Sequence, residues 1–192
     1  MLIKADGEIV DGRVVRKIQK TIERGPMTII SGIIVHQTGG SSANSSLQSY
    51  TNSSANGAHF LIDKDGTIYQ TASVYKKTWH VGKLKARCVL EKKCRPTDIK
   101  ALQSFSPSKE NAQEMQKKIP DRFPSNQDSI GIELVGETLP NGEYVTVTAA
   151  QNGSLHWLIQ NLSMTLRILP TEIFRHPTVS RKNPTEASTA KW

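Results

Sequence analysis

The chain has 192 residues, which suits one domain with a single core that buries roughly two-thirds of its unfolded surface. Hydrophobic residues make up 36% of the sequence and form no run of about 18 that could span a bilayer, so no membrane insertion is expected. The net charge is +8, and such a surface attracts polyanions such as nucleic acid, anionic lipid or the bacterial envelope.

Residues 1–26 are predicted to form an N-terminal helical extension. Val14, Val15, Ile18 and Ile22 recur at helical spacing among charged residues, and the pattern ends at Gly25-Pro26. The first eight residues lack the basic start, apolar core and cleavage site of a secretory signal. We therefore expect a protein that is cytoplasmic in its producer, or one secreted by a non-classical route to act in the periplasm or cell wall.

Strands are predicted in the next part of the chain. The β-branched run Ile33-Ile34-Val35 indicates a buried strand with His36 at its carboxyl end. A loop and a short helix are expected across residues 39–57. Residues 60–70 then carry the clearest hairpin signal, with a turn at Asp65-Gly66.

A weakly patterned insertion is predicted over residues 83–127. It holds eleven lysine and arginine residues against five acidic ones, so most of the net charge lies here. With only two aromatic residues and no recognisable module, the insertion is not expected to bind nucleic acid. Cys88 and Cys94 also lie here, and they would form a disulfide in an oxidising compartment but remain thiols in the cytosol.

The last part of the chain predicts a strand and a long helix. Apolar residues alternate through Ser129–Gly136, and Glu133 lies in the middle of this strand. A helix follows, capped by Thr146 or Thr148, with a stripe of leucine and isoleucine from Leu155 to Leu166. The order of elements predicts an α/β single domain over residues 27–192, with a central mixed β-sheet flanked by helices and the basic insertion.

Two histidines at opposite ends of the chain are candidate zinc ligands. His36 ends a buried strand, and His176 lies in the loop after the long helix, with Glu186 ten residues beyond it. Zinc in catalytic sites takes three such ligands and leaves a fourth position for water. Glu133 would then act as a general acid and base, and Lys182 would stabilise the oxyanion that forms when an amide is attacked.

Five segments together resemble the zinc-dependent N-acetylmuramoyl-L-alanine amidases. This superfamily includes AmpD-like enzymes, phage amidase lysozymes and peptidoglycan-recognition proteins, and the resemblance runs from about residue 28 to the end. It implies an amidase-like fold, Zn²⁺ held by His36 and His176, Glu133 as acid/base and Lys182 as the transition-state cation. The segments that carry it are Ile34–His36, His59–Gln70, Thr78–Gly82, Ser129–Gly136 and His176. By the same resemblance the substrate groove is lined by Thr38, Trp79 and His80.

The third metal ligand departs from the family pattern. The tail of these enzymes commonly reads Lys-x-Asp-Pro or Lys-x-Cys-Pro, whereas Pro184 occupies the ligand position here. The spacing of ten residues from His176 is that of AmpD-like enzymes, so Glu186 is the predicted ligand, with Asn183 and Thr185 as alternatives.

The resemblance implies hydrolysis of the amide between N-acetylmuramic acid and L-Ala of the stem peptide, with peptidoglycan or muropeptides as the partner. The basic insertion suits an intact anionic wall, so we favour a cell-wall-degrading toxin or lysin. One such toxin is a type VI secretion effector, which would have a cognate immunity protein. Two alternatives remain: a cytosolic muropeptide-recycling amidase, and a non-catalytic peptidoglycan-binding module, which Pro184 keeps open.

Overall fold

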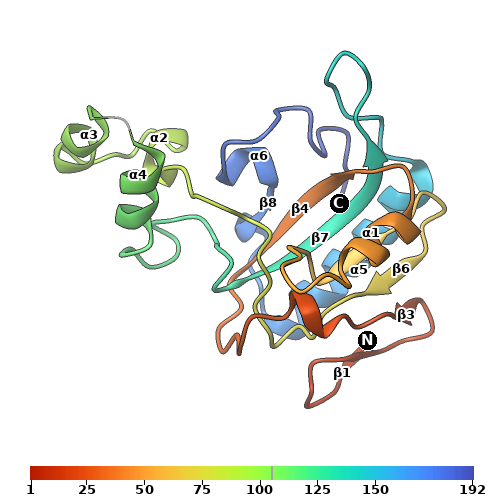
Figure 1. Ribbon diagram of the computed structural model, residues 1–192. Coiled ribbons are helices and arrows are strands. Elements are labelled where there is room, and N and C mark those ends of the chain that lie inside the picture. Colours follow the sequence, from red (N-terminus) through yellow and green to blue (C-terminus); the bar gives the residue numbers. More distant parts are fainter. Residues whose placement is uncertain (105) are drawn as a thin grey trace.

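A six-stranded mixed sheet forms the centre of the molecule (Figure 1). The computed structural model describes residues 1–104 and 106–192. The strand order is β3–β6–β5–β7–β4–β8, and neighbouring strands run parallel except β5 and β6, which form the predicted hairpin. The strands are β3 (Val14–Arg16), β4 (Gly32–Gly39), β5 (Phe60–Ile62), β6 (Ile68–Gln70), β7 (Ser129–Glu137) and β8 (Ile173–Arg175).

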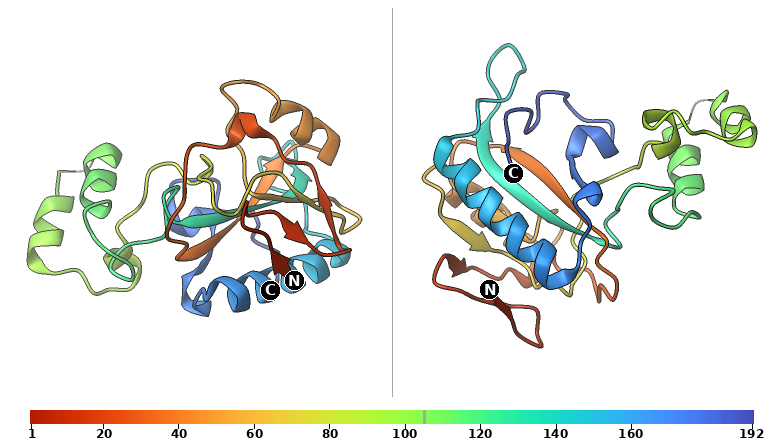
Figure 2. Two further views of the ribbon diagram at one scale, coloured as in Figure 1. Left: turned by 90° about the horizontal axis from the view of Figure 1, so that it is seen from below. Right: turned by 180° about the vertical axis from the view of Figure 1, so that it is seen from behind.

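Helices cover both faces of this sheet, which confirms the predicted fold class. The long helix α5 (Ala149–Leu166) crosses the back face (Figure 2) and packs its apolar stripe on the alternate residues of β7, such as Ile132. Thr148 begins α5 by accepting a hydrogen bond from the backbone N–H of Gln151, as a capping box requires. The short helix α1 (Ala43–Ser49) packs on the opposite face.

The prediction of an N-terminal helix is wrong. Residues 1–26 form β1 (Leu2–Ile3), β2 (Ile9–Val10), β3 and the 3₁₀ turn η1 (Lys20–Ile22). The β-branched pair Val14-Val15 suits a strand, and the open edge of β6 offers it a parallel partner. The side chain of Gln70 accepts from the backbone N–H of Ile9 and donates to the carbonyl of Gly7. The segment therefore completes the sheet instead of forming a separate extension.

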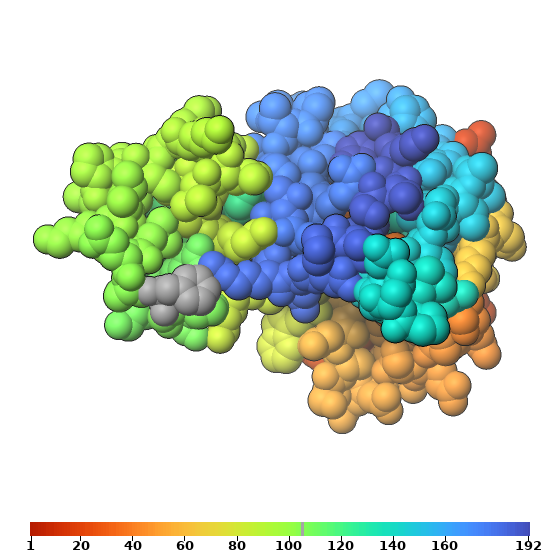
Figure 3. All heavy atoms as spheres, turned by 90° about the horizontal axis from the view of Figure 1, so that it is seen from above, coloured from red at the N-terminus to blue at the C-terminus, as the bar shows by residue number. Residues whose placement is uncertain are grey.

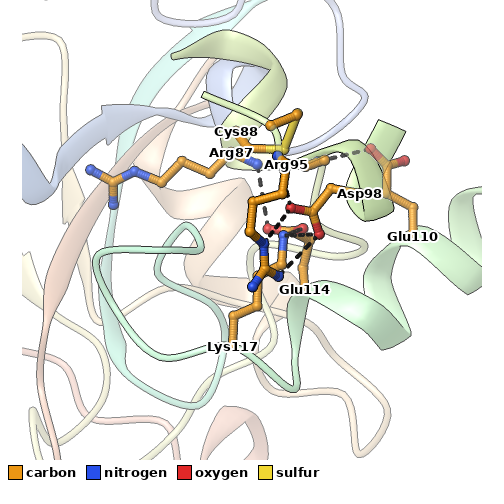
Figure 4. Close-up of a disulfide and its surroundings, with 9 residues drawn as sticks. Arg87, Cys88, Arg95, Asp98, Glu110, Glu114 and Lys117 are labelled. Atoms are coloured by element: carbon orange, nitrogen blue, oxygen red, sulfur yellow. Dashed lines mark hydrogen bonds and ion pairs between the residues drawn. A yellow bond between two sulfur atoms is a disulfide. The ribbon is translucent and has the colours of Figure 1, made fainter. Parts of the chain in front are cut away.

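The insertion forms a small helical lobe beside the β8 edge of the sheet (Figures 1 and 2). It holds α2 (Arg87–Leu90), α3 (Pro96–Leu102) and α4 (Pro107–Glu114). Cys88 and Cys94 form a disulfide in it (Figure 4). No helix of the described residues is long and apolar enough to cross a membrane.

A buried ion pair fastens the lobe to the sheet. The guanidinium of Arg87 donates to both carboxylate oxygens of Glu172, at 2.7 and 3.0 Å. Glu172 ends the 3₁₀ turn η2 (Pro170–Glu172), which leads directly into β8 and then α6 (His176–Val179). The lobe is therefore held to the segment that carries His176.

Candidate active site

A cavity of about 600 Å³ opens over the carboxyl half of β4 and the middle of β7. All eight site residues predicted from the sequence line it: His36, Thr38, Trp79, His80, Glu133, His176, Lys182 and Glu186. They come from segments far apart in the sequence. Seen from above, α1 (orange), the loop near residue 140 (teal) and the loop near residue 182 (blue) lie together on this face (Figure 3). The sheet topology therefore places the predicted groups around one site.

Three buried side chains in the cavity could hold a metal ion: His36, His176 and Glu186. Their positions follow from the sheet, since His36 lies in the middle of β4, not at its predicted end, and His176 directly follows β8, the strand beside it. Nδ1 of His176 lies 2.9 Å from Oε1 of Glu186, and Nδ1 of His36 lies 3.5 Å from the same oxygen. Two ligand atoms on a tetrahedral zinc, each about 2.1 Å from the ion, are roughly 3.4 Å apart. The observed spacings bracket that value.

The hydrogen bonds of His176 show why a cation fits here. Its Nε2 lies 2.8 Å from the carbonyl oxygen of Val81, and a carbonyl only accepts, so Nε2 carries the ring proton and Nδ1 presents its lone pair in the neutral imidazole. A lone pair facing a carboxylate oxygen is repulsive unless a proton or a metal ion lies between them. The donor set therefore requires a positive charge at this position.

The electrostatics of the cluster agree with this requirement. Burial disfavours ionisation of Glu186, but the rings of His176 and His36 beside it outweigh this effect and hold the pKa of the carboxyl at about 2. Burial and the neighbouring His176 lower the pKa of His36 to about 4. An ionised carboxylate beside a neutral imidazole is the state in which both can bind a metal.

The two alternative third ligands, Asn183 and Thr185, make hydrogen bonds to other groups. The side chain of Asn183 donates to the carbonyl of Gly142, and its oxygen accepts from Thr185. The hydroxyl of Thr185 accepts from the backbone N–H of Tyr144. The geometry therefore favours Glu186.

Glu133 lies beside His36, because the two residues are partners in the parallel register of β7 and β4. Its Oε2 is buried and has no hydrogen-bond partner among the described residues. Burial and the nearby Glu186 carboxylate raise the pKa of Glu133 to about 8, and Lys182 partly opposes this rise. Such a carboxyl in a cavity is suited to exchange protons near neutral pH.

The predicted groove residues differ in what they contact. Trp79 is 50% exposed, and the guanidinium of Arg24 lies 4.6 Å from its ring centroid. The hydroxyl of Thr38 bonds to the backbone of Gly40 and accepts from Gly136, so it fixes the end of β4. Of these side chains, that of Trp79 presents the largest exposed surface at the rim of the cavity.

His80 lines the cavity and also contacts a candidate metal ligand. Its Nδ1 lies 2.9 Å from Nε2 of His36, and its Nε2 lies 3.3 Å from the carbonyl oxygen of Ser129. Burial and the neighbouring His36 hold the pKa of His80 well below its ordinary value. The uncharged ring of His80 therefore contacts the candidate metal ligand His36 at Nε2, the ring nitrogen that does not face Glu186.

Two tyrosines in the cavity were not predicted as site residues. Tyr50, just after α1, is buried, and burial and then the Glu133 carboxylate raise the pKa of its phenol. Burial, Glu186 and Glu133 raise the pKa of Tyr144 as well. Neither tyrosine lies in a motif or at a strand end, so the sequence carried no signal for them.

Solved structures of similar fold include known amidases. A selenomethionine AmpD derivative has a TM-score of 0.59 and 19% identity, with 96% of this chain and 91% of that chain covered. The catalytic domain of XlyA has a TM-score of 0.55 and 19% identity, with 88% and 87% covered. AmiD from E. coli, solved with the substrate anhydro-N-acetylmuramic acid-L-Ala-D-γ-Glu-L-Lys, has a TM-score of 0.54 and 18% identity, with 84% and 55% covered.

A search of curated protein sequences gives no significant match. The family model Amidase_2, described as N-acetylmuramoyl-L-alanine amidase, matches residues 26–189. This match spans every strand from β4 to β8 and all of the candidate site residues. The chain therefore belongs to the Amidase_2 family of N-acetylmuramoyl-L-alanine amidases.

Proposed function

We propose that this chain is a zinc-dependent amidase that cleaves the bond between N-acetylmuramic acid and L-Ala in peptidoglycan. One observation carries the proposal. The Nδ1 atoms of His36 and His176 converge on a carboxylate oxygen of Glu186, and the cavity that they line also holds Glu133, whose Oε2 has no partner among the described residues. A metal position and a proton acceptor next to each other are what hydrolysis of an amide requires.

His36, His176 and Glu186 would hold the zinc, which when bound supplies a Lewis acid that activates water. Two neutral imidazoles and one carboxylate are a donor set that zinc accepts in catalytic sites. Val81 supports the site from outside, since its carbonyl accepts the Nε2 proton of His176 and so fixes that ring.

Glu133 would move the protons of the reaction. In its ionised form it takes a proton from the attacking water, and in its protonated form it gives that proton to the leaving nitrogen of L-Ala. Its raised pKa, about 8, makes both halves of this cycle accessible near neutral pH. No group of the described residues bonds to Oε2, which leaves it available for the hydrogen bond to water that the first half needs.

Lys182 would stabilise the oxyanion. Its ammonium lies on the exposed loop between His176 and Glu186 and lines the same cavity. A cation near the amide oxygen is worth most when that oxygen becomes negative in the tetrahedral transition state. Trp79 at the rim offers a flat aromatic surface for the sugar or peptide on either side of the bond.

Two features favour action on the cell wall over recycling in the cytosol. The disulfide Cys88–Cys94 is typical of proteins that work in oxidising compartments. The lobe that contains it is also rich in lysine and arginine, which would hold the enzyme near an anionic polymer. We therefore propose a wall-degrading role, as in a lysin or a secreted toxin.

The test is mass spectrometry of the products from two substrates: purified sacculi, and a soluble anhydro-muropeptide. The zinc-loaded protein should release free stem peptides that begin with L-Ala, while Glu133→Gln should release none and still bind zinc. Products that arise from cleavage of any other bond would refute the amidase assignment. A protein that binds about one zinc and cleaves only the soluble substrate would refute the wall-degrading role, and one that binds wall without zinc or cleavage would be a binding module.

A further inference from the structure

We infer that His80 is a positioning residue that holds the imidazole of His36 with its Nδ1 lone pair directed at the metal position. The inference rests on the proposed metal site and deepens it. The sequence suggested that His80 lines the substrate groove; in the structure it lines the cavity, and its two ring nitrogens face His36 and Ser129.

The direction of each hydrogen bond follows from Ser129. The Oγ of Ser129 donates its proton to the carbonyl of Ser125 at 2.6 Å. Both Ser129 oxygens, the carbonyl and Oγ, lie 3.3 Å from Nε2 of His80 and can only accept there. Nε2 of His80 must therefore carry the ring proton, and its Nδ1 must be an acceptor.

This acceptor determines the state of His36. Its Nε2, 2.9 Å from Nδ1 of His80, has to donate, so the proton of the neutral His36 ring lies on Nε2. Its Nδ1 is then unprotonated and faces Oε1 of Glu186 at 3.5 Å. The chain of hydrogen bonds begins at a backbone carbonyl, which cannot exchange its role, and therefore imposes one tautomer on the ligand.

The His80 ring is also held in place. Its backbone N–H donates to Oδ1 of Asn126 at 2.9 Å. Gly131 on β7 makes room for the ring, since a Cβ at that position would lie 2.7 Å from Nδ1 of His80. The ring meets His36 edge-on, with 5.1 Å between centroids and an angle of 82° between planes. These contacts hold the ring of His80 in the orientation that meets His36.

Two substitutions of similar size separate positioning from packing. The polar end of asparagine overlies Nδ1 of a histidine, so His80→Asn keeps an acceptor for His36. The longer glutamine overlies Nε2, so His80→Gln keeps the contact to Ser129 but removes that acceptor. Trp79→Ala serves as the control for metal binding, because Trp79 is next to His80 in sequence but its ring packs against Arg24, and among the described residues it has no hydrogen bond to any of the three candidate ligands.

The readout is the zinc dissociation constant of the full chain, measured by competition with a chromogenic chelator, alongside urea unfolding of the metal-free proteins. Removal of an outer hydrogen-bond partner typically weakens metal binding about 10–100-fold, so we expect that loss in His80→Gln and near wild-type affinity in His80→Asn and Trp79→Ala. Equal affinities in all variants would overturn the inference, as would equal losses in both His80 variants. Absence of zinc binding by the wild type would instead refute the proposed function.

Discussion

Replacement of Glu133 by glutamine should stabilise the metal-free protein at alkaline pH while it abolishes hydrolysis. The carboxyl has an ordinary pKa of 4.5, and burial followed by the nearby Glu186 raises it to about 8 in the folded protein. The folded state therefore binds this proton more tightly than the unfolded chain. Stability falls as pH rises from about 4.5 to about 8, because an increasing fraction of unfolded molecules releases the proton that the folded state retains.

The magnitude follows from the two pKa values. Each tenfold difference in proton affinity between the two states is about 1.4 kcal/mol. The ordinary and folded values of Glu133 therefore correspond to about 5 kcal/mol once the pH exceeds both, with about 3 kcal/mol already lost at pH 7. A glutamine has no such proton, so the free energy of unfolding of the variant should lack this dependence.

The assay is urea unfolding of both proteins in a metal chelator at pH 5, 7 and 9. We expect the free energy of unfolding of Glu133→Gln to exceed that of the wild type by an amount that grows with pH across this range. The other titrating groups of the site are common to both proteins. Zinc should reduce the gain, since a bound cation compensates the ionised carboxylate. Parallel stability curves for the two metal-free proteins would refute the assignment of a strained, buried carboxyl to Glu133.

Three further changes test other parts of the structure. Gly131→Ala should lower the free energy of unfolding by about 1–3 kcal/mol, because the new methyl group meets the ring of His80; an unchanged urea midpoint would contradict this close approach. Lys182→Met should lower kcat about 100–1000-fold and move the acid limb of the pH profile upward, since the ammonium lowers the pKa of the general base; a profile without displacement would count against their coupling. Serine in place of both Cys88 and Cys94 should lower the free energy of unfolding by about 2 kcal/mol without a change in muropeptide hydrolysis, because the disulfide lies outside the cavity; a loss of activity would link the lobe to the site.

The elements that could be predicted from the sequence are those in which local pattern and tertiary partner agree. The alternation in β7, the capped stripe of α5 and the Asp65-Gly66 turn each specify one structure without reference to the rest of the chain. Residues 11–24 did not, because their valines and isoleucines fit a helix by spacing and a strand by side-chain shape. The free edge of β6 decided between the two, and an edge partner is a tertiary fact that no window of sequence contains.

The candidate site divides in the same way. His36, His176 and Glu133 could be predicted because strand ends and strand middles fix their directions, and the resemblance supplied their order. The partners of these residues could not. Ser129 directs His80 because the loop before β7 supplies the Ser125 carbonyl that takes the hydroxyl proton of Ser129. Tyr50 comes from the end of α1 and lines the same cavity as Glu133.

The third ligand shows how the site depends on such partners. Glu186 is followed by Ala187, which has a left-handed φ of 52° that alanine rarely adopts. The side chain of Gln37 accepts from the backbone N–H of Ala187, and the guanidinium of Arg175 donates to its carbonyl at 2.9 Å. Gln37 follows His36 and Arg175 precedes His176, so the strands that present the two histidines also hold the backbone beside the carboxylate. Movement of either strand would therefore displace two candidate ligands together, and the three donor atoms keep their spacing as a unit.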